Sequence, residues 1–139
     1  MILYLDTSSL IKLYVEEEGS EAVRSQVASA SLLATSVVTY PEVCSVLSRF
    51  GRERRVTKEE QEALRRQLDS HWLQLIAIPV EERLWRHAGD LALRHGLRGL
   101  DSIHLASFLG LIDQRNRNSA EFSSFDERLN RAARLEASS

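Results

Sequence analysis

Four carboxylate residues stand where a strand is expected to end or a helix to begin. Asp6 follows a short apolar run, Glu42 falls in the first turn of a predicted helix, Asp101 opens another helix, and Asp126 follows a predicted strand. In open α/β sheets, ligands bind outside the carboxyl ends of the strands, so these side chains are expected to gather at one edge. Like charges gathered there repel unless a cation lies between them, and an oxygen-only ligand set suits Mg²⁺ or Mn²⁺. The spacing therefore predicts a carboxylate metal site.

Each of the four acids also has a purely structural explanation. Asp6 and Asp126 could cap helix N-termini, and Glu42 and Asp101 could complement helix dipoles. For any one acid taken alone this explanation is favoured, and only the joint pattern favours a metal site. Asp6 carries the most weight, because it lies directly behind four apolar residues, where a carboxylate is poorly solvated.

The elements that must position these acids alternate between strands and helices. Short apolar runs rich in β-branched residues predict strands at residues 2–5, 31–38, 75–80 and 121–124. Helical periodicity and capping signals predict helices over residues 10–14, 20–27, 40–51, 57–72, 81–95, 101–109 and 127–135. Gly51 is expected to end the third of these helices, and Trp72 and Trp85 sit at core spacing. The alternation predicts the α/β class, with a parallel sheet covered by helices on both faces.

The overall composition indicates a single domain over residues 1–139. Hydrophobic residues make up 43% of the chain, and the formal net charge of -2 excludes a protein that grips nucleic acid by bulk positive charge. The single cysteine, Cys44, excludes an internal disulfide and fits a reducing compartment. Neither a signal peptide nor an apolar run long enough to span a bilayer is found, so we expect a cytoplasmic protein without a membrane segment.

Four segments of the chain resemble the motifs of PIN-domain ribonucleases of the VapC toxin type. Residues 1–14 are similar to the opening of that family, residues 41–43 lie where its second acid falls, residues 97–106 match its most recognisable motif, and residues 122–133 resemble its closing motif. The likeness covers nearly the whole chain in the expected order. It implies one PIN-like domain with a central parallel sheet of four to five strands flanked by helices.

The same resemblance implies function and partners. It identifies Asp6, Glu42, Asp101 and Asp126 as the metal site of an endoribonuclease that uses Mg²⁺ or Mn²⁺. A VapB-like antitoxin partner encoded nearby and a homodimer are also implied. The chain departs from the family in its polar tract 113–120 and its serine-rich last strand, so Asp113 and Glu121 are alternatives to Asp126 as the fourth acid.

The expected chemistry is attack of an activated water on the phosphorus of an RNA phosphodiester. Asp6 and Asp101 are the best candidates for direct metal ligands. Glu42 and Asp126 are expected to bind through water or to orient the attacking water, and the number of ions stays open. Ser8 or Ser124 could donate a hydrogen bond to a ligand carboxylate, although helix capping explains both serines equally well.

His104 lies three residues after Asp101, on the same side of the predicted helix. It could be a metal ligand or a general acid. Its apolar neighbours and the oxygen preference of Mg²⁺ favour a hydrogen-bonded structural histidine instead.

Phosphate contacts need cations, and the densest basic group follows the Glu42 helix. The RNA-binding candidates are Lys12, Arg52, Arg54, Arg55 and Arg98, with Arg49 and Lys58 in the same basic group. A solvated helix end, with Glu53 and Glu59 as partners, explains any single one of them equally well.

Three other functions each require residues or a loss of activity that can be compared with this sequence. A phosphorelay receiver needs adjacent acids after its first strand and a late lysine, and neither occurs here. A haloacid-type phosphatase needs an aspartate where this chain has Ser8. A PIN fold that has lost catalysis and serves as a binding or scaffold module is the non-enzymatic alternative, and retention of all four candidate acids argues against it.

Overall fold

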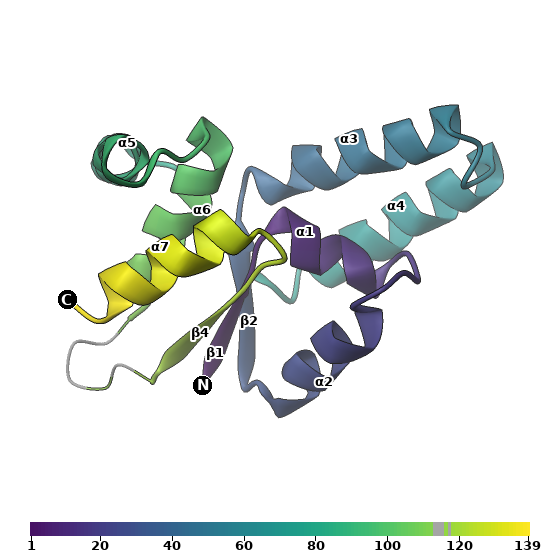
Figure 1. Ribbon diagram of the computed structural model, residues 1–139. Helices are drawn as coiled ribbons and strands as arrows, with labels where there is room; N and C mark the ends of the chain where they lie inside the picture. The colour runs from purple at the N-terminus through teal and green to yellow at the C-terminus, as the bar shows by residue number, and fades with distance from the viewer. Residues whose placement is uncertain (113–115, 117) are drawn as a thin grey trace.

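A parallel sheet forms the centre of the computed structural model, which describes residues 1–112, 116 and 118–139. Its strands within these residues are β1 (Ile2–Leu5), β2 (Leu32–Ser36), β3 (Ile76–Ile78) and β4 (Ala120–Ser123), in the spatial order β3-β2-β1-β4. Figure 1 shows β1 between β2 and β4. The predicted α/β class and parallel sheet are confirmed.

Strand β1 is central because its side chains are apolar and it has a partner strand on each side. Ile2 aligns with Leu32 of β2 and with Ala120 of β4. Successive side chains of a strand point to opposite faces of the sheet. Tyr4 accordingly joins the hydrophobic cluster on one face, whereas Leu3 joins the cluster on the other.

Helices cover both faces of the sheet, as predicted. The face of Tyr4 packs against α5 (Glu82–His95), α6 (Gly99–Leu109) and α7 (Glu127–Ala137). The opposite face packs against α1 (Thr7–Leu10), η1 (Ile11–Leu13), α2 (Ser20–Ser29), α3 (Thr39–Arg52) and α4 (Lys58–Trp72). Figure 1 shows α3 and α4 as a hairpin that extends away from the sheet. None of the helices in the described residues has the length and apolar character needed to cross a membrane.

Two predicted helix boundaries are displaced. Gly51 does not end α3, which continues to Arg52, because the left-handed turn after the helix is made by Arg54 with a φ of 59°. Helix α6 begins at Gly99. Asp101 therefore lies within the first turn of α6 instead of opening it.

The prediction that both tryptophans belong to the core is wrong for Trp85. Its side chain is 46% exposed, with the guanidinium of Arg86 at 4.9 Å from the ring centroid, because Ala88 and Leu91 supply the buried face of α5. Trp72 is partly buried and packs edge-on against Tyr40, with the ring centroids 5.3 Å apart.

Glu136 ties α7 to the end of α5. Its Oε1 atom interacts with the Arg94 guanidinium and lies 2.8 Å from Nε2 of His95. Hydrogen bonds from His95 and from Arg94 outweigh the effect of burial and hold the pKa of Glu136 below its usual value. The interaction therefore stabilises the fold above the pKa of an unfolded glutamate, and this stabilisation is lost as the pH falls through the lower folded-state pKa.

We predict that Glu136→Gln lowers the free energy of unfolding at pH 7 by about 1 kcal/mol, because a neutral amide accepts weaker hydrogen bonds than a carboxylate. The difference from the unmodified protein shrinks as the pH is lowered into the acid range. Urea unfolding at several pH values measures both effects, with Glu62→Gln, an exposed change on α4, as the control. Equal stabilities of the Glu136 variant and the unmodified protein at pH 7 would contradict the assignment.

Candidate active site

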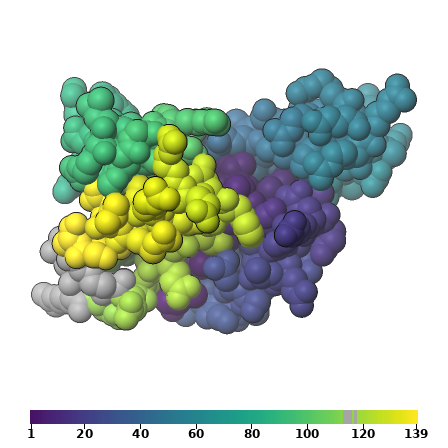
Figure 2. Space-filling model, in the orientation of Figure 1, coloured from purple at the N-terminus to yellow at the C-terminus, as the bar shows by residue number. Residues whose placement is uncertain are grey.

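All four predicted acids line one cleft of about 460 Å³. Asp6 caps α1 after β1, Asp126 caps α7 after β4, and Glu42 and Asp101 lie in the first turns of α3 and α6. Four helix N-termini, each carrying partial positive charge, thus converge on the acids. Figure 2 shows the surface dipping between the α3–α4 hairpin and the α5–α6 pair, with the N-terminal segment below.

Asp6 is only 4% exposed and is held by three hydrogen bonds. Its Oδ1 atom accepts from Ser8 Oγ at 2.7 Å and from the Ser9 amide at 3.0 Å, and its Oδ2 atom accepts from Ser124 Oγ at 2.6 Å. Burial raises the pKa of Asp6, and the serine hydrogen bonds offset this only in part. Both serines singled out in the sequence therefore contact the same carboxylate.

Glu42 lies at the end of a chain of hydrogen bonds. Its Oε1 atom accepts from Thr7 Oγ1 at 2.5 Å and lies 2.9 Å from His104 Nε2. The His104 ring is in turn 2.7 Å from the Tyr4 hydroxyl through Nδ1. Burial opposes ionisation of Glu42, but the hydrogen bonds from His104 and Thr7 prevail and lower its pKa.

Thr7 and Tyr4 are site neighbours that the sequence analysis missed. Thr7 looked like one member of a cluster of capping residues, and Tyr4 looked like one more apolar position of a strand. Their partners are 35 and 100 residues away in the chain. A helical spacing or a capping pattern reports only on near neighbours, so no signal in the sequence indicated these contacts.

Asp101 experiences the charges of the other three acids. Burial raises its pKa, and so do the charges of Asp126, Asp6 and Glu42, whereas the nearby His104 acts in the opposite direction. Within the described part of the chain, no hydrogen bond is donated to the Asp101 carboxylate. Asp126 is more exposed, and its Oδ1 atom accepts from the Leu129 amide at 2.9 Å.

The donor set of the cleft fits a hard divalent cation. All four candidate ligands supply carboxylate oxygens, and the unfavourable charge environment of Asp101 is one that a cation would relieve. No three metal-ligating side chains within the described ranges already converge closely enough to hold an ion. An ion that keeps several of its waters, as Mg²⁺ does, suits such an open arrangement.

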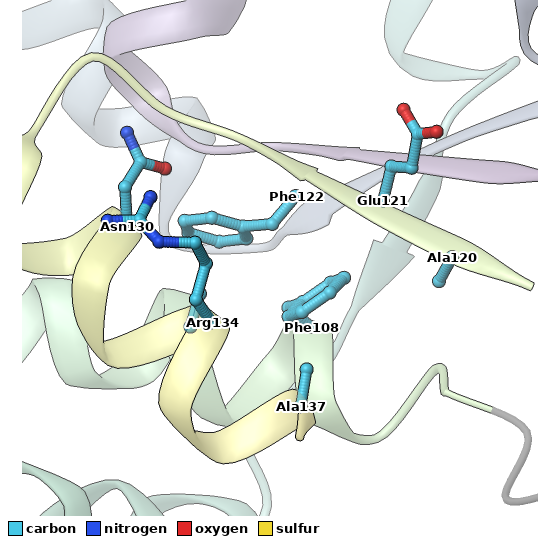
Figure 3. A pocket seen from close by; sticks show the side chains of 8 residues that line it. Phe108, Ala120, Glu121, Phe122, Asn130, Arg134 and Ala137 are labelled. Carbon is cyan, nitrogen blue, oxygen red and sulfur yellow. The ribbon is translucent and has the colours of Figure 1, made fainter. Parts of the chain in front are cut away.

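Of the two alternative acids, Glu121 lies among the described residues and is absent from the lining of this cleft. Glu121 lies on β4 and lines a different pocket of about 310 Å³, together with Phe108, Phe122 and Arg134 (Figure 3). This difference favours Asp126 as the fourth acid, because Asp126 follows the carboxyl end of β4 whereas Glu121 lies within the strand. Asp113 lies outside the described residues.

The basic candidates divide into two groups. Lys12, Arg55 and Arg98 line the cleft, and Arg49 joins them. Lys12 and Arg55 both pair with Glu17, at 3.0 Å and 3.4 Å, which is a cleft acid that the sequence analysis missed.

The other basic candidates lie away from the acids. Arg52 and Lys58 line a separate hollow at the tip of the α3–α4 hairpin, and Arg54 is absent from the residues lining the acidic cleft. The prediction that Arg52 and Arg54 bind RNA stays a prediction, and any such contact would lie outside the acidic cleft.

Comparison with known proteins gives a consistent result. The family model of the PIN domain matches residues 3–135. Two proteins of Mycobacterium tuberculosis, Ribonuclease VapC45 and Ribonuclease VapC49, are each 31% identical to this chain over 112 residues, which are 81% of this chain and 78% of the relative.

Solved structures share the fold at lower identity. VapC20 of M. tuberculosis, described as a Sarcin-Ricin loop cleaving toxin, has a TM-score of 0.68 at 17% identity and covers 94% of both chains. FitAcB from Neisseria gonorrhoeae has a TM-score of 0.68 at 19% identity, covering 96% of this chain and 94% of that one. VapBC2 from Rickettsia felis, bound to a DNA fragment from their promoter, has a TM-score of 0.64 at 15% identity, with coverages of 94% and 92%. With the family match and the identity to the two ribonucleases, these likenesses establish that the chain belongs to the PIN domain family, among ribonucleases of the VapC type.

Proposed function

We propose that this chain is a divalent-metal-dependent endoribonuclease and the toxin of a toxin–antitoxin pair. The observation that carries the proposal is the single cleft lined by Asp6, Glu42, Asp101 and Asp126, in which burial and then the charges of the other three acids raise the pKa of Asp101. The two M. tuberculosis relatives named as ribonucleases support the reaction class. A scaffold without catalysis gives no reason for four carboxylates to line one cleft.

The proposed roles follow from the contacts of each acid. Asp6 and Asp101 are proposed to bind the ion directly: Asp6 because its serine hydrogen bonds hold the carboxylate rigidly, and Asp101 because its carboxylate lacks a hydrogen-bond donor in the described part of the chain. Glu42 and Asp126 are proposed to act through water or to orient the attacking water. When bound, Mg²⁺ or Mn²⁺ would lower the pKa of a bound water and offset charge on the phosphate.

RNA is proposed to be held by local rather than bulk positive charge. Lys12, Arg55, Arg98 and Arg49 line the cleft beside the acids, although the chain as a whole carries a net charge of -2. Cations at this rim would bind the phosphates that flank the scissile bond and set the position of the strand.

A VapB-like antitoxin is the proposed protein partner, supported by the VapC-type relatives and by the likeness to VapBC2. We also propose a homodimer and action in the cytoplasm, where Cys44 would stay reduced.

Cleavage of RNA by the purified protein is predicted to need Mg²⁺ or Mn²⁺ and to stop in EDTA. Asp6→Asn and Asp101→Asn are each expected to lower kcat about a thousandfold or more, because loss of the metal removes several kcal/mol of transition-state stabilisation. A panel of structured and single-stranded RNAs provides the substrate. Asp90→Asn, an exposed acid on α5, is the control that should cut normally. Metal-independent cutting, or full activity of both site variants, would refute the proposal.

Asp101→Asn is also predicted to raise the midpoint of thermal unfolding of the metal-free protein at pH 7. The folded-state pKa of Asp101 lies above its ordinary value, which means that the fold disfavours the charged carboxylate. At a pH above that pKa, Asp101 is charged and lowers the free energy of unfolding. The neutral amide removes this penalty. Mn²⁺ should stabilise the unmodified protein and not the variant. Identical midpoints without metal would show that the acids do not repel one another.

A further inference from the structure

We propose that the hydroxyl of Tyr4, acting through the His104 ring, positions the carboxylate of Glu42 in the active site. Tyr4 and His104 are positioning residues in this scheme, because Tyr4 does not line the cleft and His104, which does, acts through its hydrogen bond to Glu42. The inference rests on the function proposed above, since Glu42 needs a fixed position only if the cleft binds a cation and RNA.

The three side chains come from three elements that meet below the cleft. Tyr4 is on β1, His104 on α6 and Glu42 on α3. The Tyr4 hydroxyl is 2.7 Å from His104 Nδ1, and His104 Nε2 is 2.9 Å from Glu42 Oε1. Tyr4 is 0% and His104 2% exposed, so water does not compete for either contact.

The direction of the hydrogen bonds follows from the chemistry of the groups. An ionised Glu42 can only accept, so the facing Nε2 atom of His104 must carry a proton. In a neutral ring Nδ1 then accepts, and the only role left for the Tyr4 hydroxyl in this contact is that of donor. Tyr4 thereby holds the ring, through Nδ1, in the orientation in which Nε2 donates to the carboxylate.

The arrangement leaves one oxygen of Glu42 available. Both Thr7 and His104 direct their hydrogen bonds to Oε1, and within the described residues no hydrogen bond engages Oε2. Two donors on the same oxygen fix the plane of the carboxylate. The second oxygen is then presented in a defined orientation to an ion or a water in the cleft.

Packing alone does not explain the Tyr4 hydroxyl. The ring stacks on Phe122 at a centroid distance of 5.7 Å and meets Phe108 edge-on at 6.4 Å, contacts that a phenylalanine would make equally well. A buried hydroxyl and a buried imidazole each carry a desolvation cost that an apolar pair would avoid. Their joint presence, aimed at one carboxylate of the cleft, points to the active site.

The experiment compares Tyr4→Phe, His104→Leu and His104→Gln with the unmodified protein. Tyr4→Phe keeps the packed ring and removes only the hydroxyl. His104→Leu removes the donor to Glu42, and His104→Gln offers an amide donor in its place. The control is Val23→Ala, which removes buried volume in α2 away from the cleft and reports the effect of lost stability alone. Measurements are made well below each thermal midpoint.

Three readouts are taken. Mn²⁺ binding is followed by electron paramagnetic resonance or calorimetry, RNA cleavage yields kcat and KM, and ¹⁵N NMR of the His104 ring reports its tautomer. Tyr4→Phe is expected to weaken Mn²⁺ binding and to lower kcat by about tenfold, at the low end of the effect of losing an outer-shell partner, with KM for RNA nearly unchanged. His104→Leu should lose more, and His104→Gln should recover part of that loss. In Tyr4→Phe the Nε2-protonated tautomer should persist, because Glu42 requires it, and the ¹⁵N signal of Nε2 should shift as its hydrogen bond to Glu42 weakens.

The proposal is overturned if Tyr4→Phe and His104→Leu match Val23→Ala in both Mn²⁺ affinity and kcat. It is also overturned if the ¹⁵N signal of His104 Nε2, which reports the hydrogen bond to Glu42, is the same with and without the Tyr4 hydroxyl. If the unmodified protein binds Mn²⁺ but cuts no RNA, weakened Mn²⁺ binding in Tyr4→Phe would support the positioning role while the proposed nuclease function fails. The two ideas are thus separated by the same set of variants.

Discussion

The carboxylate of Asp6, at the end of the central strand, has almost no access to water, and this burial determines which groups must surround it. Burial disfavours its charge, so Ser8, Ser9 and Ser124 must supply the hydrogen bonds that water would otherwise provide. One of those donors follows β4, which requires β4 to lie beside β1 in the observed register. The order of the strands and the composition of the site are therefore linked through a single side chain.

Burial also disfavours the charged forms of Glu42 and Asp101. Glu42 is supported by two hydrogen bonds to one oxygen, whereas the charge of Asp101 is opposed first by burial and then by the repulsion of its neighbours. The converging helix N-termini soften this repulsion without removing it, since each terminus carries only about half a unit charge. The charged acids therefore lower the stability of the fold, and a cation bound in the cleft would relieve this effect. The hydrophobic clusters on both faces of the sheet are extensive enough to offset it.

The sequence was sufficient for the parts that depend on local pattern. The strands, most helices and the four acids at element ends all follow from periodicity, capping and the geometry of parallel sheets. The sequence did not predict the features that depend on contacts between segments far apart in the chain. The sequence did not show that the hydroxyl of Tyr4, a core residue, contacts His104, or that Arg52 at the hairpin tip lies outside the acidic cleft. The prediction for Trp85 was wrong for a related reason. Helical spacing identifies the residues that share one face of a helix, but it does not show whether another element covers that face.

The contact between Asp6 and Ser124 also governs when the cleft is complete during synthesis. The two residues are 118 positions apart, and β4 occupies its place beside β1 only after every intervening helix has been made. A ribosome-bound chain that has emerged only as far as α6 would carry three of the acids but lack Asp126 and the serine that steadies Asp6. A chain that folds during translation would therefore complete this set of acids only once β4 and the start of α7 have been made.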